Sequence, residues 1–391
     1  MKLRNNIYKD YIYTLLTRFN ISNGIWMLYL AYKGLSLYEI GLMETVYHLT
    51  SFTMEIPTGM VADIFGRRTS RILGSIANGI SILIMIYSNN VFMFALSFFF
   101  TAIGNNLESG AGDALIYDSL KEIHEEELYL KIRGRKELFF QIAKTASLLL
   151  GGYIATFSYE RVYQVALIIA VITIIQTFTF VEPSIGKVTK QESMFKTFWF
   201  QLKNSVLTML SKKELLIMIL ALEFFSTLYT TEFFYMQNHL KALGHTTFEI
   251  GVILSIGAVL AAIMATQAYR LEKHFSLKKL IRFAIVMAVV LFWGMTIKGV
   301  EKYAFVILSG IEGLLFVVMG DYINKRIPSD KRATILSFSS MIFSFFMILL
   351  FPVVGKLGDI YGLATAFILV AICGSTALLG LLYMISKHSM K

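Results

Sequence analysis

The stretch EIPTGMVADIFGRR, residues 55–68, ends a long apolar run with two carboxylates, a proline, two glycines and two arginines. The chain around it avoids charge, because 56% of its 391 residues are hydrophobic and only 16% are charged. Its mean hydropathy is +0.64, whereas a soluble domain carries about 25% charged residues. The composition therefore predicts a chain that lies mostly in lipid and places an unusual concentration of charge at residues 55–68.

The hydrophobic segments predict how often the chain crosses the bilayer. A helix needs about 20 mostly apolar residues to span it. Twelve segments qualify, near 11–31, 38–61, 72–88, 91–115, 136–157, 162–180, 214–236, 248–269, 280–297, 303–322, 333–353 and 363–385. With the N-terminus inside, 28 of the 36 Lys and Arg residues fall on the inner side and six in outer loops. This asymmetry predicts a multi-pass membrane protein with both termini in the cytoplasm. The pI near 9.4 then reflects orientation and not nucleic-acid binding.

Three pairs of short stretches repeat in order along the chain. LSLYEIGL (35–42) is similar to TTFEIGV (246–252), GDALIYD (112–118) to GDYINKR (320–326), and LLGGYIA (149–155) to FPVVGKLGD (351–359). Chance similarity among apolar helices is the alternative. The nearly constant offset favours two parallel repeats. We therefore expect an all-α membrane protein whose twelve transmembrane helices form two pseudosymmetric six-helix halves, 1–181 and 214–391. A cytoplasmic linker at 182–213 joins them and contains an amphipathic helix at 194–210.

The segment GMVADIFGRR (59–68) resembles the loop between the second and third spans of the major facilitator superfamily. With the upstream EIP it reads E-x-P-x5-D-x3-R-R, which is similar to the macrolide and tetracycline efflux branch of Gram-positive bacteria. The resemblance covers the whole chain, including the twelve spans and the long central loop. It implies a transporter of a bacterial plasma membrane that works by alternating access as a monomer.

This segment is predicted to be a gate on the cytoplasmic side. Asp63 would accept hydrogen bonds from a neighbouring helix N-terminus, and the two arginines would contact carboxylates at the inner end of the fourth span. The alternative is a solvated basic loop that serves only membrane orientation. The predicted gating residues are Glu55, Pro57, Gly59, Asp63, Gly66, Arg67, Arg68, Asp113 and Asp118.

Charged residues within the predicted spans are candidates for the transport path, because a charge in the bilayer needs a partner or water. We expect Glu108 to pair with Arg18 or Lys144. Glu223 and Glu312 have no basic neighbour in the sequence and are the preferred proton carriers, with Glu232 as a further candidate. For each glutamate the alternative is a neutral side chain that is hydrogen-bonded between helices. The candidates for a substrate cavity are Asn105, Thr227, Tyr229, Thr230 and Met236.

The favoured function is proton-coupled efflux of a small amphipathic compound by antiport, as in drug resistance. The chain departs from the efflux members at Ser147 and Leu148, where they carry Gly-Pro, and at Asn106, where they carry arginine. A polar metabolite or lipid-linked substrate, or a transport-inactive sensor or scaffold, remains as an alternative. No P-loop, HExxH motif or paired Cys or His spacing occurs, so we expect no enzyme, no metal and no cofactor. The expected partners are a small molecule, protons and the lipid bilayer.

Overall fold

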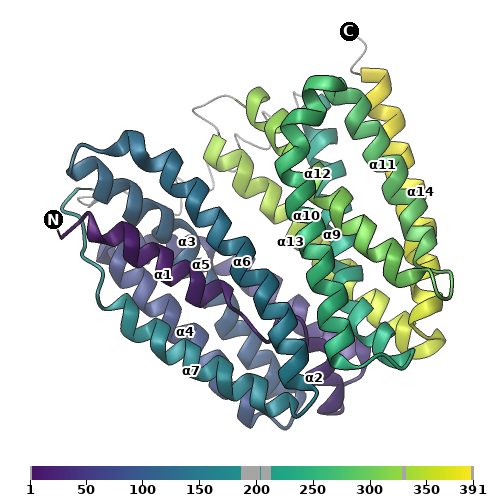
Figure 1. Ribbon diagram of the computed structural model, residues 1–391, viewed down its shortest axis with the longest axis horizontal. Helices are drawn as coiled ribbons and strands as arrows, with labels where there is room; N and C mark the ends of the chain where they lie inside the picture. The colour runs from purple at the N-terminus through teal and green to yellow at the C-terminus, as the bar shows by residue number, and fades with distance from the viewer. Residues whose placement is uncertain (1, 186–202, 204–212, 328–331, 389–391) are drawn as a thin grey trace. The chain divides into compact units, whose positions relative to one another are not determined.

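The computed structural model describes residues 2–185, 203, 213–327 and 332–388. Within these ranges the chain forms helices and no strand (Figure 1). The helices of the first part of the chain are α1 (Asn5–Arg18), α2 (Trp26–Tyr32), α3 (Leu37–Phe65), α4 (Arg67–Tyr87), α5 (Val91–Glu122), the 3-10 turn η1 (Glu126–Leu128), α6 (Tyr129–Ala155) and α7 (Tyr159–Thr177). Those of the second part are α9 (Lys213–Ala242), α10 (Thr247–His274), α11 (Leu277–Gly294), α12 (Glu301–Arg326), α13 (Arg332–Tyr361) and α14 (Leu363–His388).

Helices lie at all twelve predicted spans. By length and composition alone, nine helices among the described residues qualify as membrane spans. The predicted amphipathic helix at 194–210 lies almost wholly outside the described residues.

The first predicted span, 11–31, is wrong in one respect, because it is not one continuous helix. α1 ends at Arg18 and α2 begins at Trp26. In between, the backbone N–H and the hydroxyl of Ser22 both donate to Oδ1 of Asn20, at 3.3 and 2.7 Å. Short polar side chains that bond to the local backbone compete with helical hydrogen bonds, which accounts for the interruption.

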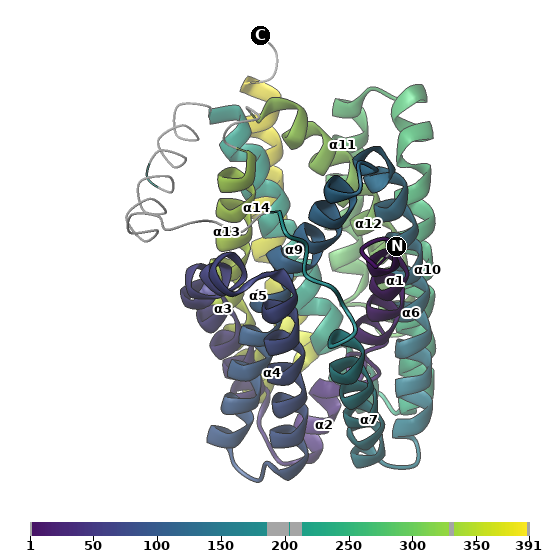
Figure 2. The same ribbon diagram turned by 90° about the vertical axis from the view of Figure 1, so that its left-hand side faces the viewer.

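The helices form two compact units. Unit 1 comprises Met1–Tyr29 and Val46–Lys196, and unit 2 comprises Leu30–Thr45 and Thr197–Lys391. In unit 1, α4 packs against α5 and α7, and α1 packs against α6 and α7 (Figure 1). In unit 2, α12 packs against α10 and α11, and α9 packs against α13 and α14 (Figure 2). α3 passes through both units, since its residues up to Thr45 belong to unit 2 and the rest to unit 1.

The repeated LSLYEIGL and TTFEIGV segments form helix starts of the same design. At the start of α3, Ser36 N–H donates to the Glu39 carboxylate at 2.8 Å and Glu39 N–H donates to the Ser36 hydroxyl at 3.2 Å. At the start of α10, Thr246 and Glu249 make the same two contacts at 2.7 and 3.2 Å. Both are capping boxes, which satisfy N–H groups that a helix leaves unpaired at its first turn. The sequence repeat thus corresponds to a structural repeat at these two positions.

Candidate functional site

The charged segment at residues 55–68 comprises the end of α3, the single linking residue Gly66 and the start of α4. Gly66 has a φ of +99°, a backbone conformation that glycine adopts without strain. The Glu182 carboxylate then accepts hydrogen bonds from the backbone N–H groups of Arg67 and Arg68, both at 2.7 Å. A negative charge at a helix N-terminus is favourable, so Glu182 fixes the start of α4. Glu182 was not predicted as part of the gating motif, because it lies more than 110 residues away along the sequence.

The two arginine side chains of this turn contact different groups within unit 1. Arg67 donates to Asp63 at 2.6 Å and lies 4.0 Å from a carboxylate oxygen of Asp118 on α5. Arg68 donates to the backbone carbonyl of Phe178 at 2.8 Å. Of the two acidic partners expected for the arginines, Asp118 lies beside Arg67. Asp63 accepts a hydrogen bond from the Arg67 side chain, one turn away. The expected donor was the N-terminus of a neighbouring helix.

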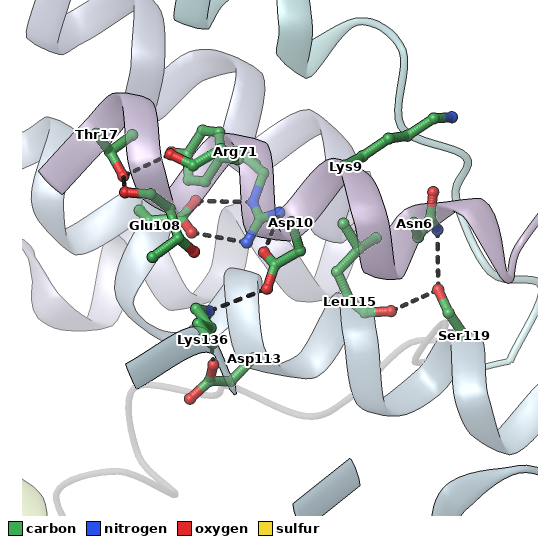
Figure 3. Close-up of polar contacts among 12 residues, drawn as sticks. Asn6, Lys9, Asp10, Thr17, Arg71, Glu108, Asp113, Leu115, Ser119 and Lys136 are labelled. Atoms are coloured by element: carbon green, nitrogen blue, oxygen red, sulfur yellow. Dashed lines mark hydrogen bonds and ion pairs between the residues drawn. The ribbon is translucent and has the colours of Figure 1, made fainter. Parts of the chain in front are cut away.

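A charge network centred on the buried Asp10 and Arg71 lies inside unit 1 and also includes the partly exposed Glu108, Asp113 and Lys136 (Figure 3). The Arg71 guanidinium has no exposed surface; it lies 2.9 Å from Asp10 and holds Glu108 through two hydrogen bonds of 3.0 and 2.8 Å. Lys136 on α6 bridges Asp10 and Asp113, at 3.3 and 3.1 Å. The network therefore joins α1, α4, α5 and α6 through alternating charges.

Two aromatic rings cover the buried guanidinium. The centre of the Arg71 guanidinium lies 4.3 Å from the ring centroid of Tyr13 and 4.6 Å from that of Phe180. These rings exclude water and add cation–π attraction. Because both rings contact the guanidinium and two carboxylates bind its nitrogens, the arrangement is that of a packed junction between helices.

The structure corrects the predicted partner of Glu108. Its charge partner is Arg71, and not Arg18 or Lys144. Arg18 is the last residue of α1, and its guanidinium lies 4.9 Å from the ring of Phe140, one turn before Lys144 on α6. In the sequence Arg71 follows the Arg67–Arg68 pair and precedes the third predicted span, 72–88, so it would be assigned to an inner loop. The available signal was Asp10, a carboxylate that lies at the edge of the first predicted span.

Asn105, a candidate for the substrate cavity, and its neighbour Asn106 connect α3 to α5 within unit 1. Asn105 donates to the phenol oxygen of Tyr47 at 3.0 Å. Asn106 and Ser51 exchange two hydrogen bonds of 2.7 Å, one from each residue. The Asn106 position, where arginine was expected by resemblance, therefore makes a neutral polar contact.

In unit 2 the predicted proton carrier Glu223 is held between two helices. Its carboxylate accepts a hydrogen bond from the hydroxyl of Ser339 on α13, and its backbone carbonyl accepts one from Thr227 at 2.7 Å. Glu223 is half-buried, and among the described residues it has no ion pair with a Lys, Arg or His side chain. Ser339 was missed, because no pattern distinguishes it from its neighbour Ser340.

Further along α9, a tyrosine connects to α12. The Tyr229 hydroxyl donates to Ser309 at 3.2 Å, and its ring stacks on that of Phe305 with an interplanar angle of 5°. Glu312 follows Ser309 by one turn on α12, so it lies near this contact. The remaining candidates on α9 differ in exposure, since Thr230 is half-buried while Thr227, Glu232 and Met236 are buried completely.

Glu232 is the most enclosed acid of the site. Neither of its carboxylate oxygens has a hydrogen-bond partner among the described residues. On the same helix, Leu228 contacts Gly374 and His239 contacts Phe367, both on α14. Glu232 lies one turn after Leu228 and therefore on the helix face that packs against α14. The described residues contain no group of three or more His, Cys, Asp or Glu side chains arranged for a metal ion.

Comparisons with known proteins agree with this architecture. The family model described as Major Facilitator Superfamily matches residues 11–345. An uncharacterized MFS-type transporter of Bacillus subtilis (strain 168), YxaM, is 24% identical over 359 residues, which cover 90% of this chain and 88% of YxaM. The solved nucleoside transporter NupG has a TM-score of 0.74 at 13% identity, over 98% of this chain and 99% of its own. A D-xylose-proton symporter has a TM-score of 0.75 at 15% identity, over 97% of both chains. At such identities the structures share a fold with this chain, and their substrates do not transfer.

Proposed function

Because the chain belongs to the Major Facilitator Superfamily, we propose that it is a proton-coupled exporter of small amphipathic compounds. Membership in this family makes it a small-molecule transporter of a membrane and not an enzyme. The step from transporter to proton-coupled exporter rests on the acids and aromatic rings of unit 2. Resemblance to the macrolide and tetracycline efflux branch at residues 55–68 supports the direction of transport and the type of compound.

The contact between Glu223 and Ser339 is the observation that carries the proposal. It sets an acid between α9 and α13 with a neutral hydroxyl as its partner. An acid of this kind changes its net charge when it takes up a proton, and no basic side chain among the described residues compensates that change. Charge inside a membrane protein is costly. Proton uptake at Glu223 would therefore alter the free energy of the surrounding helix contact, which is the requirement for coupling.

Aromatic rings beside this acid support an amphipathic substrate. Phe224, the next residue, lies 5.3 Å from Phe346 of α13 between ring centroids. Tyr229 and Phe305 form a second aromatic pair on the α12 side. Apolar aromatic walls with a few polar groups are typical of sites for drug-sized compounds. A carboxylate next to such walls favours compounds that carry a positive charge.

The test is drug accumulation in bacterial cells that express the chain, with a panel of cationic, macrolide and tetracycline compounds. Wild type is compared with Glu223→Gln and Ser339→Ala, with and without a protonophore. Ser340→Ala is the matched control, because Ser340 is exposed and its hydroxyl donates within its own helix to Leu336. We expect lower accumulation with wild type and Ser340→Ala, and loss of that difference with the protonophore or with Glu223→Gln. We expect the accumulation measured with Ser339→Ala to lie between that of wild type and that of Glu223→Gln.

If no compound responds although the protein reaches the membrane, drug export is wrong. Uptake or export of a polar metabolite or a lipid-linked compound would then be tested next. If no transport of any class is found, the transport-inactive sensor or scaffold would be favoured.

A further inference from the structure

The N-terminus of α3 is bound by a carboxylate from a distant part of the chain. Asp359 lies near the end of α13, and its two carboxylate oxygens accept hydrogen bonds from the backbone N–H groups of Leu37 and Tyr38, at 2.9 and 2.8 Å. The residues joined are 322 and 321 positions apart in the sequence. All of them belong to unit 2. The contact therefore ties a segment from the first half of the chain to helices from the second half.

Capping alone does not explain this carboxylate. α3 already begins with the Ser36–Glu39 capping box, and α10 begins with the equivalent Thr246–Glu249 box. The box satisfies part of the first turn within the helix itself. Asp359 adds a second negative charge at the same helix end, where the helix dipole favours it. Its two oxygens thus dock α3 onto α13.

A buried tyrosine makes a second connection at the same place. The hydroxyl of Tyr235 on α9 is shared between the backbone carbonyls of Phe351 and Leu37, at 2.9 and 3.2 Å. Tyr235 has no exposed surface, and its ring centroid lies 4.7 Å from that of Phe351. One phenol therefore contacts α9, α13 and α3 together. Loss of the hydroxyl would remove one hydrogen bond from each of the backbone carbonyls of Leu37 and Phe351.

The helices approach each other too closely for side chains at two glycines. A methyl group added to Gly355 would lie 2.3 Å from the Leu37 carbonyl oxygen, and one added to Gly41 would lie 2.6 Å from the Cα atom of Pro352. Small residues allow such backbone contact between membrane helices. The start of α3 is therefore fitted to this part of α13, and the contact is not a loose surface encounter.

We propose that Asp359 and Tyr235 form an outer latch, which holds the start of α3 against α13 and α9 and releases it when the substrate path opens to the outside. The positive-inside assignment places this end of α3 outside the cell, because the segment before α3 and the end of α13 carry only Lys33 and Lys356. α3 continues from unit 2 into unit 1, so a displacement of the later part of α3 would be transmitted along the helix to the latch. Asp359 is exposed, and water can replace its hydrogen bonds when the latch opens. The inference rests on family membership and does not depend on the proposed substrate or on proton coupling.

The test measures access to the latch directly and requires no substrate. The single native cysteine is removed by Cys373→Ser, and a reporter is introduced by Thr45→Cys, at a residue whose hydroxyl lies 3.4 Å from the Ile348 carbonyl of α13. Intact cells are treated with a membrane-impermeant maleimide, and the labelling rate is compared among variants. We expect Asp359→Asn to raise the rate about threefold and Tyr235→Phe about tenfold, because the second removes a buried hydrogen bond.

Matched variants control for charge and for loss of a hydroxyl. Glu249→Gln changes the cap of α10, and Tyr361→Phe changes an exposed tyrosine on α13. Neither should change the rate at residue 45. A second reporter, Ala288→Cys, lies at a fully buried position of α11 and should stay unreactive in every variant. Unchanged rates at residue 45 in Asp359→Asn and Tyr235→Phe would overturn the latch. A parallel rise at residue 288 would overturn it as well, because it would show general loosening of unit 2.

Discussion

Arg71 is a charged side chain with no exposed surface. Its buried positive charge is compensated by two carboxylates from different helices. Removing one partner of a buried ion pair leaves an uncompensated charge, which costs about 3–5 kcal/mol. Replacing all members of such a group by neutral side chains is often far less costly. We therefore expect the network to contribute specificity to the packing of unit 1 more than net stability.

We expect Arg71→Met to lower the free energy of unfolding by about 3–5 kcal/mol, because Asp10 and Glu108 would then lack their shared cation. The triple variant Asp10→Asn, Arg71→Met and Glu108→Gln should recover much of the loss. Thermal unfolding in detergent measures both. Arg133→Met is the control, since its guanidinium is 64% exposed and lies 4.0 Å from Asp113. A triple variant as unstable as Arg71→Met would contradict this account.

At this scale the sequence predicts which residues are unusual better than it predicts their partners. Glu108 is conspicuous as an acid within an apolar span, but it pairs with Arg71 and not with the predicted Arg18 or Lys144. The base itself could not be identified, because Arg71 and Arg18 are both plausible until the helices are packed. Ser339 could not be predicted at all, since its importance comes only from its position opposite Glu223.

At the scale of helices, the ends of α3 and α4 are held by carboxylates from elsewhere in the chain. Glu182 binds the first two N–H groups of α4, as Asp359 binds those of α3. The sequence predicts where these helices begin, because Ser36, Glu39 and Gly66 act locally. It does not predict the distant caps, since those depend on how α7 and α13 pack.

We expect Glu182→Gln to weaken the start of α4, because the helix N-terminus loses its negative charge. The loss should be about 1–2 kcal/mol, within the range of N-cap substitutions. Hydrogen exchange of the amides of Arg67 and Arg68 would measure it locally, with faster exchange in the variant. Glu127→Gln, an exposed acid of η1, should leave these amides unchanged. Equal protection of both amides in wild type and Glu182→Gln would show that Glu182 does not fix this helix.

At the scale of the whole molecule, the twelve helical segments follow from composition and the lengths of the apolar runs, and the family follows from the resemblance of the charged motif. These features lie in short stretches or in sums over the whole chain, so they can be identified without knowing how the helices pack. The grouping of Leu30–Thr45 with unit 2 could not be foreseen, because it depends on close backbone contacts at Gly41 and Gly355. The sequence equally cannot identify the transported compound, since no single motif specifies it.

The orientation in the membrane is a prediction for the whole chain. In a Cys373→Ser background, single cysteines at Lys33 and Ala242 should react with an impermeant maleimide in intact cells. Cysteines at Lys131 and Lys278 should react only after permeabilisation, because the positive-inside rule places them in the cytoplasm. Labelling of Lys278→Cys in intact cells would contradict both the number of spans and the placement of the termini.

The most direct test of proton-coupled export is proton movement driven by the transported compound. Everted membrane vesicles are acidified inside by respiration, and a pH-sensitive dye follows the interior while a compound identified by the accumulation assay is added. The account predicts that the interior becomes less acidic on addition, and that Glu223→Gln abolishes this change while Ser340→Ala preserves it. Uptake of the compound into the vesicles with no change in interior pH, or an unchanged response in Glu223→Gln, would contradict it.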